Sequence, residues 1–282
     1  METVKLRNGI VMPILGYGTF QLDVKDVRDC VLGAFNEGYR LIDTASSYLN
    51  EEEIKKTIMD SKIPREELFI TTKVWVQDAG YENTLRAFET SLKNLGLDYL
   101  DLYLIHQPLG DYYGSWRAME KLYQEGKVKA IGVSNFSTER LVDLCMNCSI
   151  KPMIDQVECH PFLQQKELRC VASQYGCQIQ AWGPLCEGQK DIFNHPILVD
   201  IAKKHHKTVA QVILRWQIEN QVIVIPKTKQ RTRMKENMNI WDFRLDKEDQ
   251  EAIEKMDLGY SEIINHQCYT TAKWLNLYKI HD

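Results

Sequence analysis

The chain has 282 residues, of which 44% are hydrophobic and 26% charged, and its formal net charge is −4 at pH 7. This composition fits a globular protein with a large core, and it excludes the basic footprint of a nucleic-acid-binding protein. No apolar run approaches the roughly 20 residues of a bilayer-spanning helix, and the N-terminus lacks the unbroken apolar centre of a signal peptide. We therefore expect a cytoplasmic protein that contacts neither nucleic acid nor membranes.

Short apolar segments alternate with longer amphipathic segments along the chain. The turn Asn8–Gly9, between two short apolar runs, first predicts a β-hairpin. Strands are then predicted at 14–20, 39–43, 68–74, 99–106, 128–134, 153–159, 178–184 and 222–226. Helices are predicted near 25–37, from 51 onwards, and near 81–95, 115–125, 138–146, 164–175, 196–220, 231–238 and 246–256. Asn50 and Glu53 form a capping-box pattern at the start of the second helix.

The alternation of strands and helices predicts a parallel sheet, and the strands lack the polar alternation of strands with one exposed face. Eight such units in this length fit an α/β fold, a (β/α)8 TIM barrel with an N-terminal β-hairpin and extra helices. We expect one domain over residues 1–282, because no linker or composition break occurs. The alternative is a doubly wound dinucleotide-binding fold. Gly16 and Gly18 begin its glycine fingerprint, but Gln21 occupies the third glycine position.

The cysteines raise the question of metal or redox chemistry. Cys145 and Cys148 have the spacing of a metal-binding or redox pair. A structural zinc site usually needs a second such pair, and the nearest further candidates are Cys159 and His160. We therefore interpret the thiols mainly as small buried hydrophobic side chains and expect no metal site.

Polar, ionisable residues end several of the predicted strands. Asp43, Lys73 and His106 end the second, third and fourth strands, at spacings of about one β/α unit. Functional groups of (β/α)8 barrels collect at this end of the strands. The later strands end in, or carry near their ends, Ser134, Asn135, Gln156, Glu158, Trp182 and Lys227. Each residue alone could have a structural role, but buried ionisable groups are costly unless they are paired.

Asp43, Tyr48, Lys73 and His106 together suit a proton-donor system. The ammonium of Lys73 would favour the phenolate of Tyr48 and lower its pKa, and Asp43 would keep that lysine charged and oriented. A neutral His106 could bind a carbonyl oxygen beside the phenol. Such a set can protonate an oxygen that gains negative charge, as it does when hydride is added to a carbonyl group. Because no side chain supplies hydride, a nicotinamide or flavin cofactor is required.

Residues 4–258 resemble the aldo-keto reductase family in the motifs GYRLIDTASSYLNE, ITTKVW, DLYLIH, IGVSNF, DQVECHP, AWGPL and IPKTKQRTRMKEN. The chain is most similar to the prokaryote-type branch that reduces small dicarbonyls and keto-sugars, such as 2,5-diketo-gluconate reductase. The resemblance implies a (β/α)8 barrel that uses NADPH to reduce small dicarbonyls, keto-sugars or aromatic aldehydes. It also implies that Tyr48 is the general acid, that Asp43 and Lys73 tune it, and that His106 orients the carbonyl.

The resemblance further implies a cofactor site. Ser134, Asn135 and Gln156 would hold the nicotinamide carboxamide, and Trp182 would stack on its ring, where the family more often has tyrosine. The adenosine end would be bound by Lys227, Thr228 and Arg233 at the 2′-phosphate and by Glu236 and Asn237 at the adenine. The same site would be lined by Gly18, Thr19, Asp43, Gly183, Leu185 and Pro226. From the residues alone, the four cations between 227 and 233 fit either a phosphate clamp or a solvated basic loop. Gln230 replaces a small hydroxyl residue of many relatives.

By resemblance, the substrate pocket would be formed by Phe20, Tyr48, Trp75, His106 and Gln107. Gln107 stands where the family often has tryptophan, so one aromatic wall is replaced by hydrogen-bonding groups. The segment after Trp182 is too short for a long loop over the cofactor. Residues 259–282 diverge from the family, and Trp274 could line the pocket or pack on the exterior.

Some members of this family are redox-sensing channel subunits or lens structural proteins. The complete set of Asp43, Tyr48, Lys73 and His106 favours an active reductase over both. We expect a monomer that binds a small carbonyl substrate.

Overall fold

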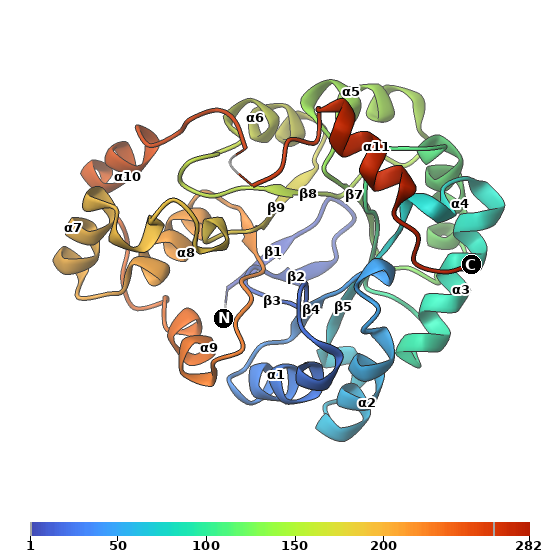
Figure 1. Cartoon of the computed structure of the whole chain (residues 1–282), viewed down its shortest axis with the longest axis horizontal. Coiled ribbons are helices and arrows are strands. Elements are labelled where there is room, and N and C mark those ends of the chain that lie inside the picture. Colours follow the sequence, from blue (N-terminus) through green and yellow to red (C-terminus); the bar gives the residue numbers. More distant parts are fainter. Residues whose placement is uncertain (1, 262) are drawn as a thin grey trace.

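The computed structural model describes residues 2–261 and 263–282 and contains a parallel sheet surrounded by helices (Figure 1). Its strands, in spatial as well as chain order, are β3 (Tyr17–Gly18), β4 (Leu41–Asp43), β5 (Phe69–Val74), β6 (Leu102–Ile105), β7 (Ile131–Ser134), β8 (Ile154–Glu158), β9 (Gln178–Trp182) and β10 (Ile223–Val224). All neighbouring strands in this sheet pair in parallel. The predicted strands are therefore confirmed in number, order and direction.

The sheet closes between its first and last strands. Leu15, just before β3, forms a parallel bridge with Val224 of β10, and the amide of Gly16 donates to the Val224 carbonyl at 2.8 Å. A Cβ on Gly16 would lie 2.4 Å from the side chain of Leu41. A Cβ on Gly18 would lie 2.8 Å from the backbone carbonyl oxygen of Ile225, the residue just after β10. The close packing of this barrel strand therefore accounts for both glycines without a dinucleotide fingerprint.

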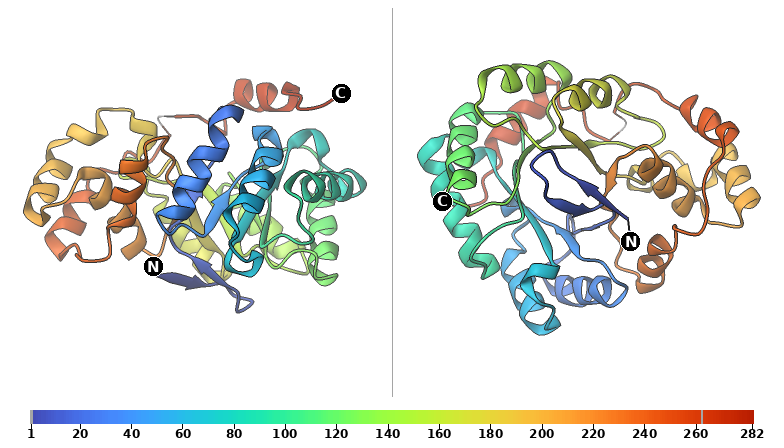
Figure 2. Two further views of the ribbon diagram at one scale, coloured as in Figure 1. Left: turned by 90° about the horizontal axis from the view of Figure 1, so that it is seen from below. Right: turned by 180° about the vertical axis from the view of Figure 1, so that it is seen from behind.

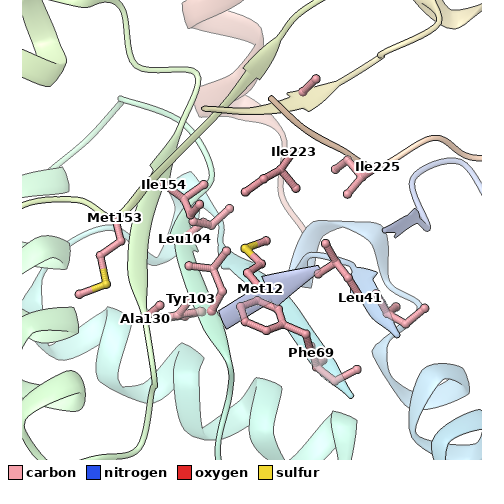
Figure 3. Packing of buried hydrophobic residues seen from close by; sticks show 14 of the residues in the cluster. Met12, Leu41, Phe69, Tyr103, Leu104, Ala130, Met153, Ile154, Ile223 and Ile225 are labelled. Carbon is pink, nitrogen blue, oxygen red and sulfur yellow. The ribbon is translucent and has the colours of Figure 1, made fainter. Parts of the chain in front are cut away.

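The predicted hairpin, β1 (Thr3–Lys5) and β2 (Val11–Pro13), pairs antiparallel and covers one end of the barrel. Met12 of β2 is fully buried and lies among Leu41, Tyr103 and Ile154 in the barrel core (Figure 3). The hairpin and helix α11 (Tyr269–Leu277) lie at opposite ends of the molecule (Figure 2). The barrel mouth is therefore at the end that carries α11.

Most of the helices that follow the strands are amphipathic and bury one face against the barrel, whereas α10 packs against α7. They are α1 (Val24–Asn36), α2 (Glu51–Ser61), α3 (Tyr81–Leu95), α4 (Tyr112–Gln124), α5 (Thr138–Asn147), α6 (Lys166–Gln174), α7 (Pro196–His205), α8 (Val209–Glu219), α9 (Arg231–Met238) and α10 (Lys247–Glu254). Among the helices of the described residues, none has the length and apolar character that a membrane crossing requires.

The helical sequence predicted near 196–220 is confirmed, and the chain divides it into two helices, α7 and α8. His206 ends α7 in a left-handed conformation with φ of 52°. Thr208 then begins α8 with a capping box, in which its side chain accepts from the amide of Gln211 and the Gln211 side chain accepts from the Thr208 amide. Helix α11, which was not predicted, follows in the C-terminal segment.

The capping box predicted at the start of α2 is wrong, although the helix begins at the predicted residue. The side-chain oxygen of Asn50 accepts from the Thr44 hydroxyl at 2.7 Å, and its amide donates to the Thr19 carbonyl at 3.2 Å. Asn50 makes no cap to its own helix, and Glu53 pairs with Lys56 on the exposed face. Asn50 therefore connects the loops after β3 and β4 at the barrel mouth.

Candidate active site

The ionisable residues that end β4 and β5 meet in the mouth of the barrel. Asp43 is the last residue of β4, Lys73 lies in β5, and Tyr48 ends the short 3₁₀ helix η1 (Ser46–Tyr48). The Lys73 ammonium lies 2.5 Å from the Asp43 carboxylate, 2.8 Å from the Thr44 carbonyl oxygen and 3.3 Å from the Tyr48 hydroxyl. His106 follows β6 directly and contacts the Tyr48 ring edge to face, with ring centroids 5.6 Å apart. The structure thus brings the four predicted residues together.

Lys73 and Asp43 form a buried ion pair, with no exposed surface on the lysine. Burial disfavours the ammonium of Lys73, but Asp43 and Tyr48 outweigh it and raise the lysine pKa. Burial also raises the pKa of Asp43, and two donors oppose this rise: the Lys73 ammonium and the Gln156 amide, which is 2.6 Å from the second carboxylate oxygen. The short contacts to both oxygens favour a carboxylate paired with an ammonium.

The pKa of Tyr48 differs in direction from the sequence prediction. Burial raises it above the ordinary value for tyrosine, and the Lys73 ammonium opposes the rise without reversing it. Lys73 also lies 4.9 Å from the centroid of the Tyr48 ring. The expected lowering is therefore wrong, because desolvation of the phenol exceeds the attraction of one nearby cation. Tyr48 is a phenol at neutral pH and retains its proton.

The imidazole of His106 is neutral. Burial lowers its pKa well below the usual range, and the positive charge of Lys73 and the nearby His266 lower it further. The ring lies edge to face between Tyr48 and Trp75, whose centroid is 5.1 Å away. The Ser47 hydroxyl lies 3.2 Å from the Nδ1 atom of His106. Sequence reasoning missed Ser47, although its position beside Tyr48 in a short loop was visible.

A layer of amides extends from Asp43 across the barrel. The Gln156 amide donates both to Asp43 and, at 3.0 Å, to the Gln180 side-chain oxygen. Gln180 is fully buried, and its own amide nitrogen has no hydrogen-bond partner in the described part of the chain. Gln180 was also missed, although a glutamine inside the apolar strand "QIQAW" was a signal of it.

Asn135, just after β7, and Trp182, at the end of β9, are hydrogen-bonded to each other across the intervening strand β8. The Trp182 indole donates to the Asn135 side-chain oxygen at 2.8 Å, and the Asn135 amide donates to the His106 carbonyl at 3.0 Å. Asn135 has a left-handed backbone with φ of 63°, which turns its side chain back over the strand ends. The Ser134 hydroxyl donates to the Gln156 carbonyl at 2.7 Å. The expected nicotinamide contacts therefore lie on one continuous polar network.

The basic segment after β10 contains two kinds of cation. Lys229 pairs with Asp23 and Asp26, and Arg231 pairs with Glu37. Two further cations of the segment, Lys227 and Arg233, are exposed and form no ion pair among the described residues, although Lys227 lies near enough to Glu187 to oppose the rise in the pKa of that carboxyl group. These two are the residues that the sequence assigned to a phosphate. Two of the four cations are thus held in ion pairs with helix α1 and the residues next to it.

The other predicted cofactor residues lie in β3 and α9 and in the loops that follow β3, β9 and β10. Thr19 is buried, and its hydroxyl donates to the Asp43 carbonyl at 2.9 Å. Glu236 accepts from the Thr208 hydroxyl at 2.8 Å, and Asn237 is buried in α9. The remaining predicted residues lie next to β3, β9 and β10 at the same end of the barrel, and they are Gly18, Gly183, Leu185, Pro226 and Thr228.

The predicted substrate residues surround Tyr48. Phe20 is 48% exposed, and its ring lies 5.0 Å from that of Tyr48, so it borders the opening. Trp75 is buried beside His106. Gln107 is buried, and its side-chain oxygen has no hydrogen-bond partner among the described residues. Such an unpaired oxygen is a group that a hydroxyl-bearing ligand can satisfy.

The C-terminal segment is attached to the barrel on two sides of the mouth. The Ser261 hydroxyl donates to the Glu158 carboxylate at 2.5 Å, and the Trp75 indole donates to the Tyr278 carbonyl at 2.9 Å. Between these points, His266 lies edge to face with Trp182, at a centroid distance of 6.1 Å. Trp274 is 55% exposed and contacts Tyr278, which places it on the exterior.

Cys145 and Cys148 have the character of protonated thiols. Burial raises the pKa of Cys145 to about 12 and that of Cys148 to about 11. A thiolate is the form that binds metals or exchanges disulfides, so both groups are poorly suited to that chemistry.

This protein has a parallel barrel with ionisable residues at its mouth, which is the architecture of (β/α)8-barrel enzymes. The profile of the aldo/keto reductase family matches residues 14–258. The chain belongs to this family, as its sequence motifs indicated, and it is an oxidoreductase that acts on carbonyl groups.

Two curated relatives are similar over nearly their whole length. The glyoxal reductase of Bacillus subtilis is 50% identical over 258 residues, which cover 91% of this chain and 93% of the relative. The methylglyoxal reductase of Escherichia coli is 41% identical over 259 residues, which cover 91% and 94%. The resemblance to the prokaryotic branch that reduces small dicarbonyls is therefore confirmed.

Solved structures agree with the barrel. An aldo-keto reductase from a deep-sea metagenome library of the Medee basin has a TM-score of 0.92 and 47% identity, with 94% of this chain and 98% of that chain covered. An aldo-keto reductase of Bombyx mori, solved in complex with NADP, has a TM-score of 0.88 and 33% identity, with 94% and 95% covered.

Proposed function

We propose that this protein reduces one carbonyl group of small dicarbonyls, such as methylglyoxal, to a hydroxyl group with NADPH, and that Tyr48 donates the proton. The observation that carries this proposal is the buried chain from Asp43 through Lys73 to the Tyr48 hydroxyl, with contacts of 2.5 and 3.3 Å. A neutral His106 lies beside that phenol. This arrangement provides a proton and a hydrogen bond at one point in the barrel mouth.

The residues at the mouth fit NADPH. The cofactor supplies the hydride when it is bound. Lys227 and Arg233 are exposed cations that form no ion pair among the described residues, and they fit a 2′-phosphate, which both side chains bind well. Asn135 and Gln156 offer amide groups at the strand ends for a carboxamide. The solved complex of the Bombyx mori relative with NADP supports the same cofactor here.

The proton transfer follows from the charges around Tyr48. The phenol retains its proton before the reaction, because burial raises its pKa. As the substrate oxygen gains negative charge, the Tyr48 hydroxyl donates its proton to that oxygen. The ammonium of Lys73, 3.3 Å away, stabilises the phenolate that results. Asp43 holds the ammonium in place, and the imidazole of His106 donates a hydrogen bond to the same substrate oxygen.

A small dicarbonyl is the substrate class that the comparisons and the pocket support best. Two relatives that match over nearly their whole length are named for the reduction of glyoxal and methylglyoxal. Trp75 forms an apolar wall at the reacting end, and the unpaired side-chain oxygen of Gln107 can accept from a hydroxyl of a hydrated dicarbonyl. The aromatic ring of Phe20 borders the opening.

Tyr48→Phe tests the role of the phenol. Loss of a positioned general acid should lower kcat/KM for methylglyoxal by about 10²- to 10⁴-fold, while binding of NADPH, measured by calorimetry, should be unchanged. Tyr269→Phe, which removes a hydroxyl from an 81% exposed tyrosine on α11, is the matched control. A Tyr48→Phe enzyme that reduces methylglyoxal at nearly the wild-type rate would contradict the proposal. A panel that includes a keto-sugar and an aromatic aldehyde tests the substrate class.

A further inference from the structure

Ser47 makes a contact to His106 that its neighbour Ser46 does not share. Ser47 is the middle residue of η1, and its hydroxyl oxygen lies 3.2 Å from the Nδ1 atom of His106. The Ser46 hydroxyl instead donates to the backbone carbonyl of Lys73 at 2.9 Å. In the described part of the chain, Nδ1 of His106 is the one hydrogen-bond partner of the Ser47 hydroxyl. This contact is therefore specific to one atom of the imidazole.

The ring of His106 is held in a fixed orientation. Tyr48 and Trp75 contact it edge to face from two sides, with centroid distances of 5.6 and 5.1 Å. The side-chain amide of Asn135 donates to the backbone carbonyl of His106 at 3.0 Å. With the ring fixed in this way, Nδ1 faces Ser47, and Nε2 has no hydrogen-bond partner among the described residues. Nε2 is then the atom available to a substrate.

A neutral imidazole carries one proton, and its position decides what Nε2 can do. With the proton on Nε2, this atom donates to a carbonyl oxygen, and Nδ1 needs a donor of its own. With the proton on Nδ1, Nε2 presents a lone pair that repels the substrate oxygen. A hydroxyl can donate or accept, but Nδ1 is the acceptor that the Ser47 hydroxyl has among the described residues, so its proton is used here when it donates to Nδ1. This direction favours the first tautomer, because the hydrogen bond of one ring nitrogen sets the proton on the other.

We propose that Ser47 is a positioning residue, whose hydroxyl donates to Nδ1 of His106 and thereby places the single imidazole proton on Nε2. The consequence for catalysis rests on the proposed function, in which His106 binds the substrate carbonyl. The tautomer itself is a property of the protein without substrate and can be measured separately.

The decisive experiment compares Ser47→Thr with Ser47→Val, two side chains of the same shape that differ in the hydroxyl. The protein is labelled with ¹⁵N at histidine and saturated with NADP⁺, and the His106 resonances are assigned by their absence in His106→Gln. In the wild type and in Ser47→Thr, we expect a pyrrole-type Nε2 and a hydrogen-bonded, pyridine-type Nδ1. In Ser47→Val, the two ¹⁵N shifts should move toward each other, because the proton is shared between the nitrogens.

Kinetics provides the second measurement. Loss of one hydrogen bond should lower kcat/KM for methylglyoxal by about 3- to 10-fold in Ser47→Val, and Ser47→Thr should stay within about 2-fold of the wild type. Ser47→Ala removes the hydroxyl without added bulk and should follow Ser47→Val. Ser61→Ala, which removes a serine hydroxyl at the end of α2 outside the site, is the control.

Unchanged ¹⁵N shifts in both Ser47→Val and Ser47→Ala would overturn the proposal, as would a wild-type resonance with the proton on Nδ1. Either result can occur in an enzyme that reduces methylglyoxal well, so it would not affect the proposed function. Conversely, if the protein reduced no carbonyl compound, the ¹⁵N shifts would still report the tautomer. The two failures are therefore distinguishable.

Discussion

Removing one partner of the buried pair between Asp43 and Lys73 should destabilise the fold strongly. In Lys73→Met, the carboxylate of Asp43 stays fully buried and keeps only the neutral amide of Gln156 as a donor. In Asp43→Asn, the ammonium of Lys73 keeps only the Thr44 carbonyl and the Tyr48 hydroxyl. Breaking a buried ion pair in this way costs about 3–5 kcal/mol of the free energy of unfolding.

The double variant Asp43→Asn/Lys73→Met should lose less stability than the two single losses together, because it buries no charge at this position. We expect the coupling between the two substitutions to be about 2–3 kcal/mol. Urea denaturation followed by circular dichroism gives the four free energies of unfolding. Each variant should also be nearly inactive toward methylglyoxal, because the support of Tyr48 is lost.

The exposed ion pair between Lys127 and Glu89 is the matched control. Its atoms are 2.7 Å apart, but the side chains are 43% and 59% exposed, so water screens the interaction. The same double-mutant cycle on this pair should give a coupling below about 1 kcal/mol. If the coupling at Asp43 and Lys73 is no larger than that of the surface pair, the reasoning about a buried ion pair is refuted.

Three further predictions concern the cofactor, the substrate and pH. Arg233→Ala should raise KM for NADPH about 10-fold or more and leave KM for NADH nearly unchanged. Arg231→Ala removes a cation that is already paired with Glu37, and it should change neither of these two KM values. Equal losses for both cofactors in Arg233→Ala would contradict a phosphate contact. Gln107→Trp should change the ratio of kcat/KM for methylglyoxal to that for an aromatic aldehyde by about 10-fold, and an unchanged ratio would place Gln107 outside the pocket. Because the pKa of His106 is well below 6.5 in the folded protein, the unfolded chain alone takes up this proton as the pH falls below about 6.5. Stability in urea should then decrease by up to about 1.4 kcal/mol per pH unit, and an equally steep decrease in His106→Gln would exclude this residue as the cause.

The barrel and the meeting of its ionisable residues could be predicted because both depend on spacing along the chain. Each β/α unit takes about 30 residues, and parallel strands bring their carboxyl ends to one edge of the sheet. Asp43, Lys73 and His106 therefore had to share the barrel mouth once their strands were identified. Tyr48 follows Asp43 by five residues, which places it in the loop at the same end of the barrel, but the sequence left open whether it faces the mouth or is only a loop aromatic.

The contacts that spacing does not determine could not be predicted. Asn50 fits a helix cap by local pattern, but the carbonyl of Thr19 and the hydroxyl of Thr44 satisfy its side chain in the folded barrel. Local sequence shows the competing caps and turns but not which distant groups will lie within reach. Ser261 of the C-terminal segment likewise bonds to Glu158, a residue 103 positions earlier in the chain.

The pKa of Tyr48 shows that burial can outweigh the effect of a charged neighbour that the sequence correctly predicts. From the sequence, a neighbouring ammonium alone was expected to lower this pKa. In the structure, the same burial that brings Lys73 close to Tyr48 also removes the phenol from water, and this effect is the larger one. For a proton donor the result is favourable, because the group must hold its proton until the substrate oxygen becomes basic. In the proposed mechanism, Lys73 then acts after the transfer, when the phenolate exists, and stabilises the product of the proton transfer more than the resting phenol.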